Sequence, residues 1–305
     1  MAVSAIKNMN IRLLHVFVAV VRHQGYARAQ QELNLTTSAI SNYMSELEQR
    51  LGFVLCQRGR AGFALTPKGE QFLQQSLHLL REIDEFERQA DVLKGDLGGT
   101  FRLAVIDSTV TDPALSLPDA ISKFSERFPA VHINLQIRSP HEQVQGIINN
   151  QIDFAIGTFP SSVHNVIALP MYREQHWLYC SDMHPLFAEK QLSLARVTQF
   201  GIVSRTYWSA SDLGKRGFKH STASVDSMEA QLILILSGKY VGYLPEHYAL
   251  RWVKEQRLRA LLPTEFGFQA PFFMFFRRGR SKEVFIRAMR DLLKTRTRQK
   301  SQTAR

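Results

Sequence analysis

The pattern of apolar residues changes at a glycine-containing segment, residues 95–99, and this change divides the chain in two. Before it, apolar residues recur every three or four positions, which predicts helices and one short hairpin. After it, short apolar runs alternate with helical patterns, which predicts parallel sheets covered by helices. The 305 residues therefore form a helical N-terminal domain and a larger α/β domain, with residues 95–99 as a hinge.

Residues 11–51 have the pattern of a helix-turn-helix. Apolar spacing predicts a first helix over residues 11–21, ended by Gly25, and a second over about residues 26–33. Residues 34–35 form a tight turn before a third helix. Such an arrangement presents its third helix to the major groove of DNA.

The third helix has one apolar and one polar face. It begins with Thr36 or Thr37 as N-cap and ends at Gly52. The apolar positions are Ile40, Met44, Leu47 and Leu51. The opposite face carries small or hydrogen-bonding side chains, as a helix that enters the major groove requires. These are Ser38, Ser41, Asn42, Ser45 and Gln49.

A hairpin and a long helix complete the N-terminal domain. Apolar runs at residues 53–56 and 63–65 flank a basic turn, and its arginines, Arg58 and Arg60, would lie along phosphates or in the minor groove as a wing. Thr66-Pro67 then begins a helix that runs to about residue 93. Its apolar stripe comprises Leu73, Leu77, Leu80, Ile83, Phe86, Ala90 and Leu93. Either a partner helix or the chain's own domain could cover this stripe, and we favour the partner.

The α/β domain is predicted to alternate strands and helices. The expected strands are residues 101–106, 131–138, 154–157, 166–172, 176–180, 201–204, 240–244 and 272–276. The expected helices are residues 113–128, 141–149, 227–237 and 282–294. Ligands on such sheets bind beyond the carboxyl ends of the strands.

Positive charge is concentrated at the two ends of the chain. The net charge is +11, of which residues 1–68 contribute +5, residues 69–276 contribute −3 and residues 277–305 contribute +9. The basic N-terminal segment suits a polyanion such as DNA. The basic C-terminal segment is either a solvated helix face with a frayed end or an accessory contact to DNA.

Cysteine usage and hydropathy indicate a cytoplasmic protein. Cys56 and Cys180 lie far apart, so we expect reduced, buried thiols and neither a disulfide framework nor a thiol sensor. No N-terminal stretch has the pattern of a signal peptide. No segment approaches the roughly 18 apolar residues that a membrane span needs.

An enzyme is the main alternative, and the sequence does not favour it. The ten histidines lack metal-ligand spacing, and neither a nucleophile elbow nor a phosphate-binding loop is found. Asp107 and Asp153 could be paired carboxylates but are more simply a strand end and a turn. A secreted solute receptor would need an export signal and would leave the N-terminal domain unexplained. We expect no catalysis, no cofactor and no metal.

Several recurring residues carry a resemblance to a known family. Between Phe17 and Leu73 they are Leu33, Ala39, Ile40, Ser41, Leu47, Glu48, Leu51, Gly52, Leu55, Arg58, Leu65, Thr66 and Gly69. Residues 99–106, 184–186 (His-Pro-Leu) and 238–245 (Gly-Lys-Tyr-Val-Gly-Tyr-Leu-Pro) continue the match. In these positions the chain resembles the LysR-type transcriptional regulators, over nearly its whole length.

The resemblance implies an N-terminal all-α winged helix-turn-helix over residues 1–68 and a dimerising linker helix over residues 67–94. It also implies a C-terminal α/β, two-lobed, periplasmic-binding-protein-like effector domain over residues 100–305. Lobe 1 would comprise about residues 100–165 and 265–295, and lobe 2 about residues 166–264. The implied partners are double-stranded DNA, a small-molecule effector, further copies of the chain in a homodimer or homotetramer, and RNA polymerase.

The chain departs from the family where the third helix would contact DNA. The family often has Gln-Pro in place of Thr37-Ser38 and arginine in place of Asn42, so the usual contacts cannot all be made. Asn42 suits bidentate contact with N6 and N7 of adenine. We predict base contacts from Thr37, Ser38, Ser41 and Asn42, and backbone contacts from Arg28, Arg58 and Arg60. The alternative for each is a solvated surface residue.

In the family fold the effector lies between the two lobes. The matching positions are Ser108, Thr109, Ser139, Thr158, Ser204, Trp208 and Asp226. Hydroxyls beside free N–H groups at helix starts can bind a carboxylate, and Tyr207 or Trp208 could stack on a ring. We predict a small organic acid or an aromatic compound as effector. Each hydroxyl could instead only cap a helix, Trp208 could simply be packing, and Arg205 is either an anion clamp or a surface charge.

Overall fold

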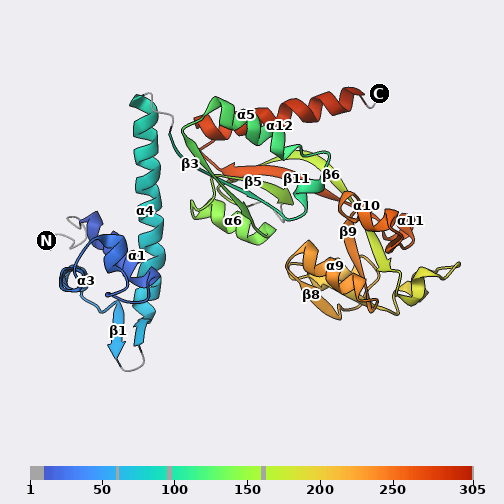
Figure 1. The fold of residues 1–305 in the computed structure, drawn as a ribbon, viewed down its shortest axis with the longest axis horizontal. Coiled ribbons are helices and arrows are strands. Elements are labelled where there is room, and N and C mark those ends of the chain that lie inside the picture. The colour runs from blue at the N-terminus through green and yellow to red at the C-terminus, as the bar shows by residue number, and fades with distance from the viewer. Residues whose placement is uncertain (1–9, 60–61, 95–97, 159–162, 304–305) are drawn as a thin grey trace. The chain divides into compact units, whose positions relative to one another are not determined.

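The computed structural model shows two compact units, Met1–Asp96 and Leu97–Arg305, which are coloured in sequence order in Figure 1. It describes residues 10–59, 62–94, 98–158 and 163–303. Within these ranges no helix is both long and apolar enough to cross a membrane.

The first unit begins with the predicted helix-turn-helix. Helix α1 (Ile11–Arg22) and helix α3 (Thr37–Leu51) confirm the first and third predicted helices. Thr36 caps α3, because its hydroxyl accepts a hydrogen bond of 3.2 Å from the N–H of Ala39. Gly52 ends α3 with a φ of 76°, a left-handed conformation that favours glycine.

The second helix is shorter than predicted. Helix α2 spans only Gln30–Leu33, and the residues before it form turns. Tyr26 and Ala29 enter the core from those turns, so their apolar spacing does not mark a helix. Asn34 follows α2 with a φ of 52° and forms the predicted turn.

The wing is a hairpin whose first strand starts later than predicted. Strand β1 (Cys56–Gly59) pairs antiparallel with β2 (Gly62–Leu65). Residues 53–55 are not in a strand, because the N–H groups of Leu55 and Cys56 donate to Glu48 Oε1 at 2.7 and 3.3 Å. This segment is therefore anchored to α3, and the start of β1 is held beside that helix.

Helix α4 (Pro67–Lys94) is the predicted long helix. The Thr66 hydroxyl accepts a hydrogen bond of 2.9 Å from the N–H of Gly69 and so caps it. Leu73, Leu77 and Leu80 pack into the core of the first unit. Farther along the stripe, Phe86 is 72% exposed. The chain's own domain thus leaves Phe86 of the stripe uncovered, while Ile83 and Ala90 are half-buried.

The second unit is built on a single nine-stranded sheet in the order β4-β3-β5-β11-β6-β9-β7-β8, with β10 beside β6. The strands are β3 (Gly99–Val105), β4 (Val131–Ile137), β5 (Phe154–Thr158), β6 (Val166–Ser181), β7 (Gly201–Arg205), β8 (Ala223–Val225), β9 (Tyr240–Pro245), β10 (Leu258–Ala260) and β11 (Phe268–Arg277). Strands β3, β4 and β5 are parallel to one another, as are β7, β8 and β9. The long strands β6 and β11 run antiparallel between these two groups and make two lobes.

Helices cover both faces of each lobe. They are α5 (Leu117–Arg127), α6 (Pro140–Ile148), α7 (Leu194–Val197), α8 (Ala210–Gly214), α9 (Met228–Leu236), α10 (Glu246–Lys254), α11 (Pro263–Phe266) and α12 (Val284–Thr303), with 3₁₀ turns at Thr109–Thr111 and Pro185–Phe187. In lobe 1, α5 and α12 pack on one face of the sheet and α6 on the other (Figure 1). In lobe 2, α8 and α11 pack on one face, and α9 and α10 on the other.

Four predictions for this unit need correction, one of them the end of the last helix, which runs to Thr303 and not to residue 294. The strands predicted at residues 166–172 and 176–180 are one strand, β6, because the polar residues between them remain in the sheet. Helix α5 begins at Leu117, after the 3₁₀ turn that follows β3, and not at residue 113. Strand β11 begins at Phe268, four residues before its prediction.

Candidate functional site

The polar face of α3 is open to solvent. Thr37, Ser38 and Asn42 are exposed, and Ser41 is half-buried. The Thr37 hydroxyl accepts a hydrogen bond from Gln30, and the Ser38 hydroxyl lies 3.0 Å from that of Thr36. Within the described residues, the side chains of Ser41 and Asn42 have no hydrogen-bond partner. Together with Ser45 and Gln49, which are exposed and likewise have no partner among the described residues, they are free to contact another molecule.

The structure places only one of the three predicted arginines. Arg28 is exposed in the turns before α2. The backbone of Arg58 belongs to β1, but its side chain lies outside the described residues, and so does Arg60 as a whole.

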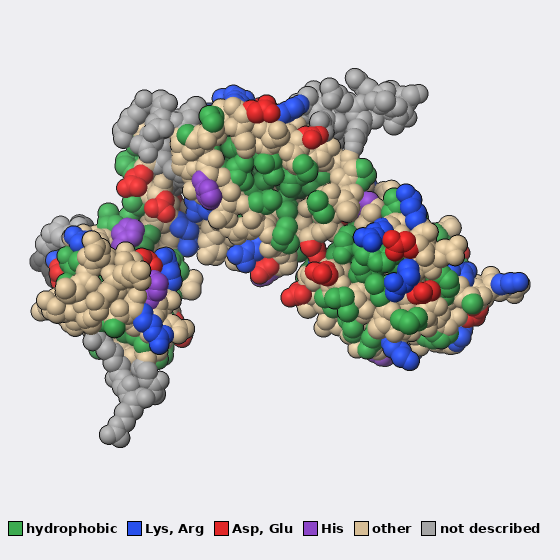
Figure 2. Space-filling view, in the orientation of Figure 1, with side chains coloured by type: hydrophobic (Ala, Val, Ile, Leu, Met, Phe, Trp, Pro, Cys, Tyr) green, Lys and Arg blue, Asp and Glu red, His purple; other side chains and the backbone are tan. Residues whose placement is uncertain are grey.

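A cavity of about 250 Å³ lies between the lobes, at the carboxyl ends of β3, β5 and β7. Its lining includes Asp107, Thr158, Arg205, Trp208, Arg216, Tyr243 and Phe268. A second cavity, of about 400 Å³, is lined by Asp107 and Arg205 too and extends to Ser139 and Asp226. Charged side chains of both signs lie along the facing edges of the lobes (Figure 2).

The predicted effector residues separate into three groups. Thr158 and Trp208 line the smaller cavity, whereas Ser139 and Asp226 line the larger one. Ser108, Thr109 and Ser204 line neither of the two. The Ser108 and Thr109 hydroxyls donate to nearby backbone carbonyls at 2.6 and 3.2 Å. Ser139 caps α6, as the alternative interpretation of its hydroxyl proposed.

Arg205 joins the two lobes. It is 3% exposed, so the interpretation as a surface charge is wrong. Its guanidinium donates to the Asp107 carboxylate at 3.3–3.4 Å, and Asp107 also accepts from the N–H of Met228 at the start of α9. A carboxylate of lobe 1 is therefore bound by a cation and a helix N-terminus of lobe 2.

Three aromatic rings in the smaller cavity surround a second arginine, which the sequence pattern did not indicate. The ring centroids of Trp208, Tyr243 and Phe268 lie 5.2–6.3 Å apart. The Arg216 Cζ atom lies 4.2 Å from the Phe268 centroid and 4.5 Å from that of Trp208. These are cation–π distances, which fix the guanidinium at the cavity wall.

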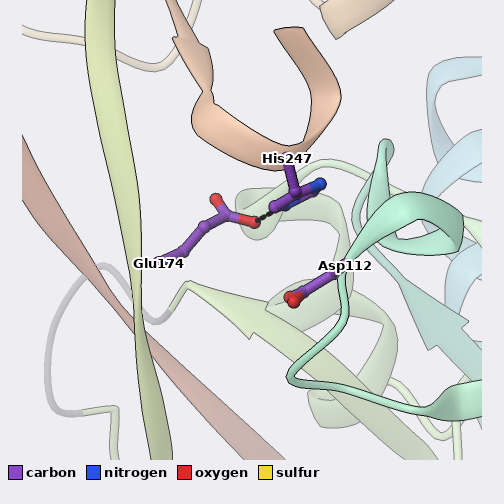
Figure 3. Close-up of side chains that lie close together, drawn as sticks. All are labelled: Asp112, Glu174 and His247. Atoms are coloured by element: carbon purple, nitrogen blue, oxygen red, sulfur yellow. Dashed lines mark hydrogen bonds and ion pairs between the residues drawn. The ribbon is translucent and has the colours of Figure 1, made fainter. Parts of the chain in front are cut away.

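A buried polar cluster connects the lobes beside the cavity. Glu174 of β6 accepts a hydrogen bond from His176 at 2.6 Å. It accepts another from His247 of α10 at 2.9 Å, which Figure 3 shows. His247 also lies 2.9 Å from the Thr111 hydroxyl of lobe 1. Asp112, drawn with them in Figure 3, accepts from the Tyr172 hydroxyl.

The same cluster contains a donor set that a divalent cation could use. Candidate ligand atoms of Asp112, Glu174 and His247 lie within 4.8 Å of one another. Each of these side chains, however, already has a hydrogen-bond partner within the protein. Those hydrogen bonds compensate the burial of these polar side chains, so a bound ion is not needed to explain why they are buried.

We expect Glu174 to make the second unit sensitive to acid. Burial alone would raise the pKa of Glu174, but hydrogen bonds from His176 and His247 outweigh it and hold the pKa below its usual value of 4.5. A lowered pKa stabilises the fold above about pH 4.5, and that contribution is lost as the pH falls through the folded-state pKa. In thermal melts of the second unit, Glu174→Gln should lower the midpoint at neutral pH and flatten its decline in acid. An unchanged acid slope in the variant would contradict this assignment.

Both cysteines are buried, which confirms their structural interpretation. Burial raises the pKa of the Cys180 thiol to about 12, so its reactive thiolate is scarce at neutral pH.

The chain matches two family models. The model described as "LysR substrate binding domain" matches residues 94–298. The one described as "Bacterial regulatory helix-turn-helix protein, lysR family" matches residues 11–70. Together they cover both units of the structure.

Curated relatives and solved structures agree with these matches. The chain is 33% identical over 284 residues to the HTH-type transcriptional activator BauR of Pseudomonas aeruginosa, covering 92% of this chain and 93% of the relative. It is 26% identical to the RuBisCO operon transcriptional regulator of Allochromatium vinosum, covering 94% and 96%. The structure of full-length CbnR with its target DNA superposes with a TM-score of 0.69 at 21% identity, covering 94% of this chain and 100% of that one. The predicted fold class is thereby confirmed.

Proposed function

Because the chain belongs to the LysR family of DNA-binding transcriptional regulators, we propose that α3 recognises its operator and that an effector bound between the lobes controls this binding. The strongest support for operator recognition by α3 is that one face of this helix is buried and the opposite face is polar and open to solvent. Ile40, Met44 and Leu47 are each 0% exposed, whereas Ser41 and Asn42 keep unpartnered polar groups on the other side. A helix held rigidly on one side can present those groups to base edges.

In this proposal Thr37, Ser38, Ser41 and Asn42 contact bases, and Arg28, Arg58 and Arg60 contact the phosphate backbone. Gln30 and Thr36 orient the Thr37 and Ser38 hydroxyls, and of the unpartnered Ser41 and Asn42 the amide of Asn42 offers both a donor and an acceptor, so we infer that Asn42 is the main discriminating side chain. Its side-chain amide can donate to N7 and accept from the N6 amino group of the same adenine. No other base presents this pair of groups in the major groove.

Assembly is the second part of the proposal. Phe86 and Leu79 of α4 are 72% and 46% exposed, which is costly for large apolar side chains on one helix. We infer that the α4 helices of two copies pack together into a homodimer and that dimers pair into a tetramer on DNA. The protein would act in the cytoplasm without catalysing a reaction, and RNA polymerase is a further partner.

The effector would act through the two lobes. Asp107 and Arg205 connect them across the cavities, so a ligand there changes the contacts that set the angle between the lobes. Such a ligand shifts the regulator only if its affinity differs between the two arrangements. A change in the angle between the lobes would in turn alter the spacing between the two pairs of DNA-binding domains in the proposed tetramer.

Selection of genomic fragments by the purified protein tests the proposal. Footprinting of enriched fragments at physiological salt should show a short two-fold symmetric sequence with a second site nearby. Affinity should also fall steeply with salt, because phosphate contacts release counterions. Enrichment of no sequence, with binding that follows charge alone, would refute sequence-specific regulation.

Asn42→Ala should weaken operator binding by about 1–3 kcal/mol. The loss should fall on one base position, since the amide contacts one base pair in the proposed geometry. Binding to operators randomised at each position would measure it. The matched control is Gln75→Ala, which removes an exposed amide from α4 of the same unit and should leave the preference intact. An unchanged sequence preference in the Asn42 variant would remove this residue from the recognition surface.

A further inference from the structure

Arg216 brings a positive charge into the smaller cavity that no described carboxylate neutralises at ion-pair distance. Its Nη1 donates to the backbone carbonyl of Asp212 at 2.7 Å. Its Nε is buried and has no hydrogen-bond partner within the part of the chain that the structure describes. Arg205, the other cation of this cavity, differs because Asp107 pairs with it.

The Arg216 charge is held in an environment that disfavours it. Burial lowers the pKa of Arg216, because the surrounding rings replace the water that would solvate the guanidinium. Arginine nevertheless stays protonated in proteins. Arg216 is half-buried with a buried Nε, and a cation in such a place is stabilised by a bound anion, which supplies both opposite charge and hydrogen-bond acceptors.

Two further buried donor groups in the cavity lack partners. Among the described residues, the Tyr243 hydroxyl has no partner, although the residue is only 1% exposed, and Arg205 Nε has none either. Burial raises the pKa of Tyr243, so the hydroxyl keeps its proton and can donate it to an acceptor. Buried polar groups without partners are rare in folded proteins, and here three belong to side chains that line one cavity, which favours a ligand with acceptor atoms at this site.

The acidic groups of the cavity are already satisfied. Asp107 accepts from Arg205 and from the N–H of Met228, and Glu174 accepts from two histidines. Among the described residues, the cation without a carboxylate at ion-pair distance is therefore Arg216, which Asp212 attracts only from farther away. A ligand beside Arg216 would meet this cation and two carboxylates that already accept hydrogen bonds, which favours an anion there over a cation.

We propose that the effector is a small carboxylate, held by Arg216 and the Tyr243 hydroxyl beside the rings of Trp208 and Phe268. This inference rests on the proposed function, since it assigns a ligand class to the cavity that we expect to control DNA binding. The planar guanidinium can donate two parallel hydrogen bonds to a carboxylate. A cavity of about 250 Å³ lies below the roughly 300–1,000 Å³ of pockets for drug-sized ligands, so the acid must be small.

Calorimetric titration of the full-length protein with acids and their matched amides tests the proposal. The probes are straight-chain monocarboxylates of two to six carbons, succinate and benzoate, each against its primary amide, with inorganic phosphate and sulfate as separate anions. We expect at least one acid to bind and its amide to bind at least about 30-fold more weakly. Equal binding of acid and amide would overturn the proposal, as would binding of phosphate or sulfate alone.

Variants assign the binding to this cavity. Arg216→Met should weaken binding of the acid by about 30-fold or more, and Tyr243→Phe by about 10-fold. Arg216→Lys keeps the charge without the planar donor pair and should give an intermediate loss, which separates recognition from a folding defect. The matched control is Arg196→Met, because Arg196 packs on the Phe200 ring at 4.8 Å but does not line the cavity.

The outcomes also separate this proposal from the proposed function. If the wild-type protein protects its operator but binds no acid of the panel, the carboxylate assignment is wrong, whereas the proposed regulatory function is supported. Wild-type affinity in Arg216→Met would be equally decisive against the assigned residues. A protein that binds an acid but shows no sequence-specific footprint would instead contradict the regulatory function.

Discussion

Phe17→Ala should remove about 3–5 kcal/mol from the stability of the N-terminal unit. Phe17 is 0% exposed, and its ring centroid lies 5.6 Å from that of Phe72 on α4. Truncation therefore opens a cavity where α1 supports both α3 and α4. Such a loss is a large part of the 5–15 kcal/mol that typically stabilises a protein.

Calorimetry of the full chain measures this effect, because the two units have separate cores and should melt in separate transitions. The variant should lower only the transition of the first unit and abolish DNA binding near the growth temperature. Phe17→Leu, which retains most of the buried volume, serves as control and should lose much less stability. A parallel fall of both transitions would show that the units do not unfold independently.

Asp153→Asn should destabilise the second unit by about 3 kcal/mol. Asp153 is 1% exposed and accepts from Arg280 at 2.8 Å and from the Nε and backbone N–H of Arg102 at 3.2 and 2.8 Å. The amide would leave these buried cations without their counter-charge. We expect the lower end of the roughly 3–5 kcal/mol for broken buried pairs, because Arg280 keeps two hydrogen bonds to Glu283.

Denaturant unfolding monitored on the second unit would report the loss at Asp153. Glu255→Gln provides the comparison, since it removes a carboxylate from an exposed pair with Arg251 and should cost below about 1 kcal/mol. Equal effects of the two substitutions would mean that the Asp153 network contributes nothing beyond a surface ion pair. This network also shows that Asp153 and Asp107 are not paired carboxylates, because Asp107 binds Arg205 beyond the other end of β3.

The helix-turn-helix could be predicted because its information is local. Apolar spacing, a threonine cap and a terminal glycine fix α3 within a single stretch of chain. Local patterns gave wrong secondary structure where tertiary contacts determine the backbone conformation. Tyr26 and Ala29 fill the core from turns, and residues 53–55 are bound by the Glu48 carboxylate in place of a partner strand.

The inter-lobe cavity could be located from the sequence only in outline. The rule that ligands lie beyond strand ends found Thr158 and Trp208, but Arg216, Tyr243 and Phe268 come from distant segments that no local motif connects. Glu174 misled the prediction of β6, since a charged residue between apolar runs predicts a break. Its hydrogen bonds to two histidines allow the strand to continue through the buried region.

The route of β11 has a consequence for how a new copy of the protein matures. Strand β11 is a central member of the sheet and pairs with β5, although Thr158 and Phe268 are separated by more than a third of the chain. At synthesis rates of about 5–20 residues per second, β5 waits roughly 5–20 s on the ribosome for this neighbour. The helix-turn-helix needs nothing made after α4. Each nascent chain therefore completes its helix-turn-helix several seconds before the central strand of its second unit has been synthesised.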